Sequence, residues 1–174
     1  MKKIVQSVIA SVFVLAASAA FGQSAAPNDA QIAGIVVAAN TVDIDAGKLA
    51  QKMSKNKEVQ QFGKQMMTDH TGVNKQATAL VKKLKVKPED SDTSKSLKDS
   101  GKANTSKLKG LKGAEFDKAY IENEVTYHQA VIDALDKTLI LNAKSAELKT
   151  MLEKVRPAFV AHLEHAKQIQ QSLK

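Results

Sequence analysis

The segment KEVQQFGKQMMTDHTGVNKQATALVKKLK, residues 57–85, decides the fold class of this 174-residue chain. Its apolar positions recur at alternating steps of three and four residues, and His70 falls on the same line of positions. This spacing predicts an amphipathic α-helix that packs at a shallow angle in a bundle, because such steps keep one face toward the neighbouring helices. Asn56 is its predicted N-cap. The line of inward positions comprises Val59, Phe62, Met66, His70, Val73, Ala77, Leu80 and Leu84.

Three other segments repeat this pattern, over about residues 29–53, 114–140 and 146–173. With residues 57–85 they predict four helices of about 25–29 residues, each about 37–43 Å long. The links near Ser54 and Asn142 are short, so each joins an antiparallel pair. The pattern predicts an all-α, ferritin-like four-helix bundle.

The connection over residues 86–113 joins the second and third predicted helices and is long enough to run the length of the bundle, as in ferritin-like folds. It begins with Pro88 and a polar stretch, and its centre, residues 93–108, has only Leu97 and Leu108 as large apolar contacts. We therefore expect the connection to be partly helical.

The first 22 residues have the form of a secretory signal peptide. Lys2 and Lys3 precede an apolar run over residues 4–21, and small residues flank the predicted cleavage point before Gln23. The alternative is an uncleaved membrane anchor, since the run is close to the shortest span of a bilayer. The sequence favours export to the periplasm, with outer-membrane association as a further option, and leaves residues 23–174 as a single four-helix-bundle domain.

Composition excludes several classes of protein. The chain has no Cys, which excludes disulfide scaffolds, Cys-ligated metal sites and thiol enzymes. Its formal charge of +8 is concentrated in residues 75–112, where eleven Lys stand against four acidic residues. That segment contains no Arg and no aromatic residue, and Arg156 is the only arginine of the chain. Nucleic-acid binding is therefore disfavoured, because base readout favours Arg and single strands favour aromatic platforms.

The lysines of this segment have two interpretations. They form a solvated face, or they attract the protein weakly to an anionic surface of the cell envelope. The sequence predicts no oligomeric state. The residues that would carry the attraction are Lys82, Lys83, Lys85, Lys87, Lys95, Lys98, Lys102, Lys107, Lys109 and Lys112.

Three of the four histidines occupy inward positions on three different helices. His70, His128 and His162 each lie near the middle of their predicted helix, so we expect them at one level of the bundle. Three imidazoles with a carboxylate suit zinc, copper, iron or nickel. The alternative is a structural polar layer that fixes register by hydrogen bonds. The candidate metal ligands are His70, His128 and His162, with support from Asp43, Glu124, Asp69 and His165.

Enzymatic activity is disfavoured by the motifs. No His has Glu three residues before it, so the paired Glu-x-x-His motifs of di-iron bundles are absent from the sequence. No nucleophile stands near an inward His at recognisable spacing, and no Gly-rich phosphate loop is visible. A catalytic site is not predicted, and a redox enzyme at the histidines is a third hypothesis.

Several motifs resemble a known bacterial family. Residues 63–71, GKQMMTDHT, resemble the Met-x-x-Asp-His-Thr signature of the domain-of-unknown-function family numbered 4142. Residues 113–120, GAEFDKAY, with His128 following, and Pro157 followed by His162 are similar to the family's later motifs. Residues 43–50, DIDAGKLA, are similar to its acidic-x-acidic-x-Gly-x-Leu-Ala segment, with Asp where Glu is more usual.

The resemblance covers about residues 28–173 and implies an exported, ferritin-like bundle of a kind often labelled an outer-membrane protein, without an established activity. It places the family's histidines on His70, His128 and His162. Tyr127 stands where the family often has an acidic residue, which leaves Glu124 as the carboxylate of that helix. The function expected is that of a non-enzymatic envelope protein, and the alternative is a bundle that stores, buffers or senses a transition metal.

Overall fold

The computed structural model describes residues 26–173, and within that range the chain is all-α. The predicted signal peptide lies outside the described residues. No helix within them is long and apolar enough to cross a membrane. The elements are α1 (Asp29–Met53), α2 (Lys57–Lys83), α3 (Asp92–Lys109), α4 (Gly113–Ala134), a π-helical segment (Leu135–Leu139), α5 (Ile140–Asn142) and α6 (Ala146–Ser172).

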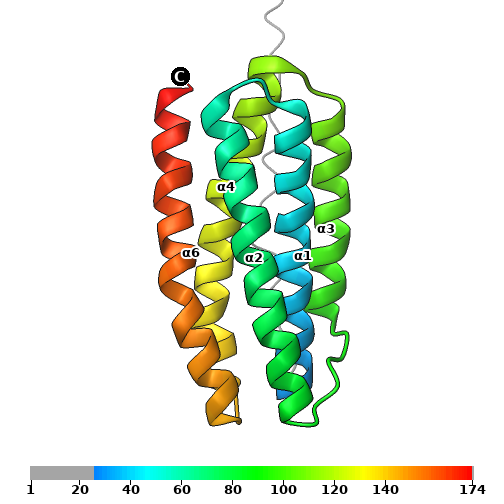
Figure 1. Cartoon of the computed structure of the whole chain (residues 1–174). Coiled ribbons are helices and arrows are strands. Elements are labelled where there is room, and N and C mark those ends of the chain that lie inside the picture. Colours follow the sequence, from blue (N-terminus) through cyan, green and yellow to red (C-terminus); the bar gives the residue numbers. More distant parts are fainter. Residues whose placement is uncertain (1–25, 174) are drawn as a thin grey trace, which may run out of the picture.

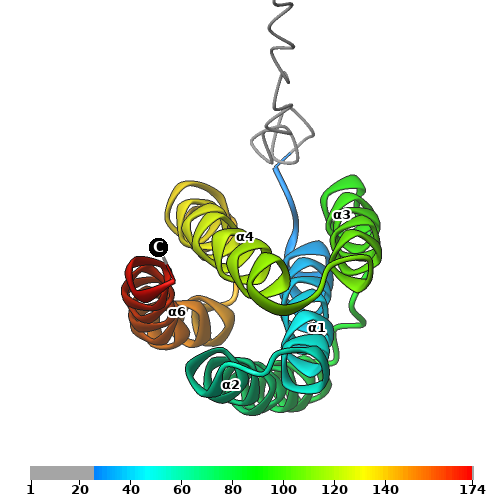
Figure 2. The same ribbon diagram turned by 90° about the horizontal axis from the view of Figure 1, so that it is seen from above.

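The long helices run side by side in a bundle (Figure 1). Seen end-on, α1, α2, α6 and α4 surround the core in that order, and α3 lies outside this ring against α1 (Figure 2). The chain ascends α1, descends α2, ascends α3, descends α4 and ascends α6 (Figure 1). Because α3 carries the chain back along the bundle, α2 and α4 run parallel.

The connection over residues 86–113 is more ordered than the sequence suggested. It contains α3, an 18-residue helix that begins at a capping box, in which Ser91 and Ser94 exchange side-chain and backbone hydrogen bonds. Gly101 lets α3 approach α1 closely, since a Cβ there would lie 2.6 Å from a methyl carbon of Val42. In α3 the close contact at Gly101 takes the place of the stripe of large apolar residues by which an amphipathic helix is predicted from sequence.

Two predicted helices differ in detail. The helix predicted over residues 57–85 ends at Lys83, because Lys85 adopts a left-handed backbone conformation (φ 55°) that stops it. The helix predicted over residues 114–140 is formed by α4, the π-helical segment and α5 in succession. The π-helical segment adds one residue to a turn, and Leu135 and Leu139 still face the core. In α6 the helix continues through Pro157.

The core consists of two apolar clusters stacked along the bundle. One includes Ile32, Leu135 and Leu152, and the other includes Phe62 and Phe116. Buried polar residues lie between them at mid-height. Gly47 brings α1 against α2 one turn from Asp43, because its Cβ would lie 2.6 Å from the carbonyl oxygen of Gly63. This close approach sets the spacing of α1 and α2 at the polar level.

Candidate metal centre

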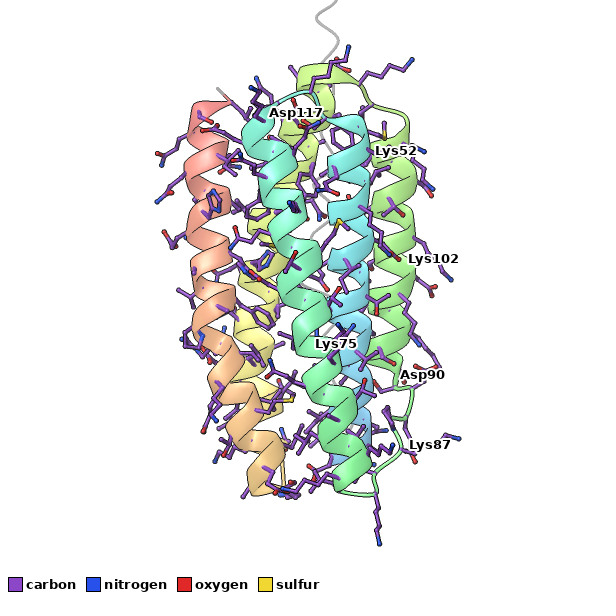
Figure 3. The ribbon with its side chains drawn as sticks, in the orientation of Figure 1. Lys52, Lys75, Lys87, Asp90, Lys102 and Asp117 are labelled. Carbon is purple, nitrogen blue, oxygen red and sulfur yellow. The ribbon has the colours of Figure 1, made fainter. Side chains whose placement is uncertain are left out.

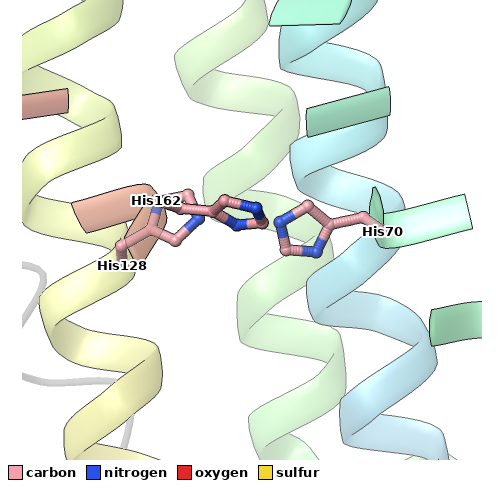
Figure 4. Close-up of side chains that lie close together, drawn as sticks. All are labelled: His70, His128 and His162. Atoms are coloured by element: carbon pink, nitrogen blue, oxygen red, sulfur yellow. The ribbon is translucent and has the colours of Figure 1, made fainter. Parts of the chain in front are cut away.

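Five of the buried polar residues form one layer across the bundle: Asp43 from α1, His70 from α2, Glu124 and His128 from α4, and His162 from α6. We call these five residues the polar layer. Each is at most 3% exposed. The three imidazole rings point toward one another from three helices (Figure 4). One nitrogen from each ring lies within 4.8 Å of the other two, and an equally tight group joins Asp43, Glu124 and His128.

The outer nitrogen of His70 is fixed by an amide. His70 Nδ1 lies 2.7 Å from Asn40 Oδ1, and Asn40 Nδ2 donates to Asn74 Oδ1 at 3.0 Å, which sets the orientation of the Asn40 amide. Because an amide oxygen only accepts, Nδ1 of His70 carries the hydrogen. Phe159 stacks on the same ring, with centroids 5.1 Å apart and planes 13° apart. His70 is therefore held in position on both its edge and its face.

The other two imidazoles are anchored in the same way. His128 Nδ1 donates to the backbone oxygen of Glu124 at 3.0 Å, and His162 Nε2 donates to Asp69 Oδ2 at 2.9 Å. The inner nitrogens are His70 Nε2, His128 Nε2 and His162 Nδ1, and none has a hydrogen-bond partner among the described residues. Metal-binding histidines show this division, with one nitrogen held by an oxygen and the other free.

Asp43 supplies an oxygen at the centre of the layer. Its Oδ2 lies 2.7 Å from His70 Nε2 and 3.4 Å from His128 Nε2. Neither contact has hydrogen-bond geometry, and both Asp43 oxygens lack a partner within residues 26–173. A carboxylate oxygen and an imidazole lone pair repel each other at 2.7 Å. A proton or a metal cation between them turns this repulsion into attraction.

The environment separates the pKa values of the two buried carboxyls. Burial alone would raise the Asp43 pKa, but the positive charges that His70 and His128 carry when protonated outweigh it and lower that pKa to about 2. Burial raises the pKa of Glu124 well above its usual value, and the negative charge of Asp43 adds to this rise. The layer thus favours one ionised carboxylate, Asp43, and one protonated carboxyl, Glu124.

Burial also favours the neutral form of two of the histidines, His128 and His162. It lowers the pKa of His128 to about 4, although Asp43 acts in the opposite direction, and it lowers the pKa of His162 against the effect of Asp69. Neutral imidazole is the form that binds metals. His128 and His162 therefore present uncharged nitrogen donors beside the anionic oxygen donor Asp43.

Two predicted supporting residues lie outside the layer. Asp69 has a side chain that is 41% exposed and reaches only the outer nitrogen of His162. His165 packs edge-on against the Phe62 ring, with centroids 5.2 Å apart, and its Nδ1 lies 3.2 Å from Gln65 Oε1. The structure brings together His70, His128, His162, Asp43 and Glu124, leaves Asp69 in a supporting position, and places His165 apart.

Sequence reasoning missed Tyr120, which is fully buried beside the layer. Burial raises its pKa well above the usual value, and the nearby Glu124 and Asp43 carboxyls contribute. Its hydroxyl has no hydrogen-bond partner in the part of the chain that the structure describes. The spacing of Tyr120, Glu124 and His128 at four-residue intervals on α4 is the signal that places all three on one face.

The fold and the site define an all-α helical bundle with a buried histidine–carboxylate layer at mid-height. The chain belongs to the family described as Domain of unknown function (DUF4142), whose model matches residues 14–169. This confirms the resemblance predicted from its motifs. Neither a curated protein nor a solved structure matches the chain.

Proposed function

We propose that the protein binds a divalent transition-metal ion in the polar layer, through His70 Nε2, His128 Nε2, His162 Nδ1 and Asp43. The observation that carries this proposal is the pairing of anchored outer nitrogens with free inner ones on all three rings. Ligand atoms about 2.0–2.1 Å from a tetrahedral ion lie about 3.3 Å apart. The 3.4 Å from Asp43 Oδ2 to His128 Nε2 agrees with that spacing, whereas the 2.7 Å from Asp43 Oδ2 to His70 Nε2 is shorter, so these two side chains must separate to admit the ion.

The donor set narrows the choice of ion. Three imidazoles and one carboxylate suit zinc, copper, iron or nickel and not magnesium or calcium, which prefer oxygen ligands. The proposed ligands are almost completely buried. Closed sites are typical of metals that are held, whereas catalytic sites keep a position open to substrate. We therefore propose storage, buffering or sensing of the ion, with no turnover.

A cobalt titration tests the proposal. We expect protein purified without a tag and treated with chelator to bind one Co²⁺, with the strong visible bands of a four-coordinate ion. Zn²⁺ should displace it. A His165→Ala variant is the matched control, since His165 lies outside the layer, and should bind equally well. Substoichiometric binding, or visible bands that depend on His165, would show that the layer is instead held by protons and hydrogen bonds.

The finer identity of the fold is also a proposal. We infer a ferritin-like arrangement, because α1, α2, α4 and α6 form the ring around the core and the chain returns along the bundle between α2 and α4. Export to the periplasm is proposed from the basic and apolar pattern of residues 1–22. Both features accord with a non-enzymatic protein of the envelope.

We propose weak attraction to an anionic envelope surface through a lysine edge. It runs from the end of α2 along α3 and includes the ten lysines named above. All ten are exposed, and Lys87 and Lys102 point away from the bundle (Figure 3). Ion pairs within the chain engage Lys83, Lys98 and Lys102. The remaining lysines of the edge are available to an external anion.

Vesicle binding tests the lysine edge. We expect binding to phosphatidylglycerol vesicles that weakens with salt, and none to phosphatidylcholine vesicles. Replacing Lys95, Lys107 and Lys109 with Gln should weaken binding on the order of a hundred-fold, since each lysine near an anionic surface contributes about 1 kcal/mol. The exposed lysines Lys144, Lys149 and Lys154 provide a control with the same charge change. Equal losses in the two triple variants would contradict a specific edge.

A further inference from the structure

An apolar cavity adjoins the polar layer on the side of the α4–α6 connection. It has a volume of about 30 Å³ and lies among α1, α4 and α6, with side chains such as Val36, Leu135 and Val155 in its wall. The rings of His70 and His128 form part of the same wall. We propose that this cavity binds one small uncharged diatomic molecule of the class of dioxygen or nitric oxide, beside the ion proposed above.

Size sets the first limit on the occupant. At about 30 Å³ the cavity has about a fifth of the volume of an apolar cavity that admits benzene, about 150 Å³, so a metabolite does not fit. Apolar cavities of this kind exclude water and accept apolar gases. The wall is formed mostly by buried aliphatic side chains.

The polar groups of the wall set the second limit. Tyr127 donates its hydroxyl hydrogen to the backbone oxygen of Ala39 at 2.8 Å, and the Asn40 amide is held by His70 and Asn74. The outer nitrogen of His128 is engaged by a backbone oxygen. A charged or strongly polar molecule would lose its hydration here, and the wall atoms without a partner are His70 Nε2 and His128 Nε2, which are proposed to bind the ion. The occupant is therefore uncharged.

The π-helical segment supplies an independent reason to regard the cavity as a site. Leu135 and Leu139, its first and last residues, both line the cavity. Single π turns are rare and are frequent at functional sites. Asp136 within this segment accepts two hydrogen bonds from Arg156 at 2.6 and 2.7 Å, next to Pro157 of α6. Arg156 thus holds the π-helical segment against α6.

The position beside the histidines selects among small apolar molecules. The inner nitrogens left free on the two wall histidines are the proposed metal ligands. Dioxygen and nitric oxide both enter apolar cavities and bind transition metals through a lone pair, whereas dinitrogen of similar size binds them poorly. This part of the inference rests on the proposed function. Occupation of the cavity itself requires no metal.

Dioxygen is its own probe, because it is paramagnetic. In metal-free protein labelled at methyl groups, dioxygen under pressure should enhance the relaxation of the Leu135, Leu152 and Val155 methyls far above that of exposed methyls. Dinitrogen at the same pressure provides the baseline.

The Ala134→Leu variant fills the cavity and should reduce the enhancement about ten-fold. Leu139→Val enlarges the cavity and should increase it. Ala77→Leu, a change of the same size at a buried alanine outside the wall, is the packing control.

The second arm uses nitric oxide and protein loaded with Fe²⁺. We expect nitric oxide to add to the bound Fe²⁺ as a fifth ligand in the unchanged protein, and about ten-fold slower formation of this adduct in Ala134→Leu with the same Fe²⁺ affinity. No dioxygen effect in either the unchanged protein or Leu139→Val would overturn the cavity proposal. A dioxygen effect without any metal binding would support the cavity and overturn the proposed function. Equal nitric oxide rates in Ala134→Leu and the unchanged protein would overturn delivery through the cavity.

Discussion

Replacing His128 with alanine should lower the affinity for Co²⁺ or Zn²⁺ by more than about 100-fold. His128 belongs to both tight groups of donor atoms, and its Nε2 lies 3.4 Å from Asp43 Oδ2. Changing a residue that only supports a ligand costs about 10–100-fold in metal affinity, and removing a ligand should cost more. Competition titration against a chromophoric chelator measures the loss directly.

Thermal unfolding gives a second measure of the same prediction. An ion at 100 times its dissociation constant stabilises a folded protein by about 2.7 kcal/mol if it does not bind the unfolded chain. The unchanged protein should therefore melt several degrees higher with the ion, and His128→Ala should not. Comparing each protein with and without metal removes any effect of the substitution on folding.

Two further variants sharpen the result. Asn40→Ala removes the acceptor for His70 Nδ1 and should lower the affinity by about 10–100-fold, an effect between those of His165→Ala and His128→Ala. This graded order is specific to a metal held by the inner nitrogens. If His128→Ala and His165→Ala lost the same amount, the ion would be bound on the surface.

The polar layer was predicted mainly from the steps of three and four residues between the inward positions of each helix. His70, His128 and His162 were predicted at one level because each lies near the middle of a helix of similar length, and helix length sets height at 1.5 Å per residue. Asp43 was predicted as a supporting ligand. What the spacing does not encode is which ring nitrogen faces inward. That depends on oxygens from Asn40, Asp69 and the backbone of α4, which are brought in by tertiary packing.

Other features were hidden for identifiable physical reasons. Few large apolar residues mark α3, because Gly101 and the Ser91 cap stabilise it instead. The π-helical segment depends on packing against α6, where Arg156 forms an ion pair with Asp136. The sequence of residues 135–139 alone contains no signal that predicts it. Local periodicity predicts elements whose stability comes from an apolar stripe. It underestimates elements that depend on close backbone approach or on a distant ion pair.

Acid should destabilise the metal-free protein in two stages. The His128 pKa is about 4 in the folded protein against 6.5 for free histidine, so the unfolded chain takes up this proton first as pH falls. The folded state then loses about 3 kcal/mol between pH 6.5 and 4, from 1.36 kcal/mol for each pH unit. Asp43, with a pKa of about 2 against 3.8, should remove about 2 kcal/mol more below pH 4. Urea unfolding with chelator present measures both stages.

Glu124 should act in the opposite direction, and this makes Glu124→Gln a stabilising substitution near neutral pH. Burial, followed by the charge of Asp43, raises the Glu124 pKa well above 4.5. The unfolded chain releases this proton above pH 4.5 while the folded protein retains it, so stability falls as pH rises toward the folded pKa. Glutamine keeps the shape of the protonated acid and removes this loss. Metal-free Glu124→Gln should therefore have a higher free energy of unfolding than the unchanged protein at pH 7, and the difference should shrink toward pH 4.5.

The matched control is Glu122→Gln, at an exposed position on the same helix, which should leave the unfolding free energy nearly unchanged at both pH values. Urea denaturation of the three proteins at pH 7 and pH 4.5, with chelator present, decides the matter. A Glu124→Gln variant that is less stable at pH 7 than at pH 4.5, relative to the unchanged protein, would mean that Glu124 is ionised within the fold. The layer would then carry two buried negative charges, which only protonated histidines could balance in the metal-free protein. Its attraction for a divalent ion would come from charge more than from the free imidazole nitrogens.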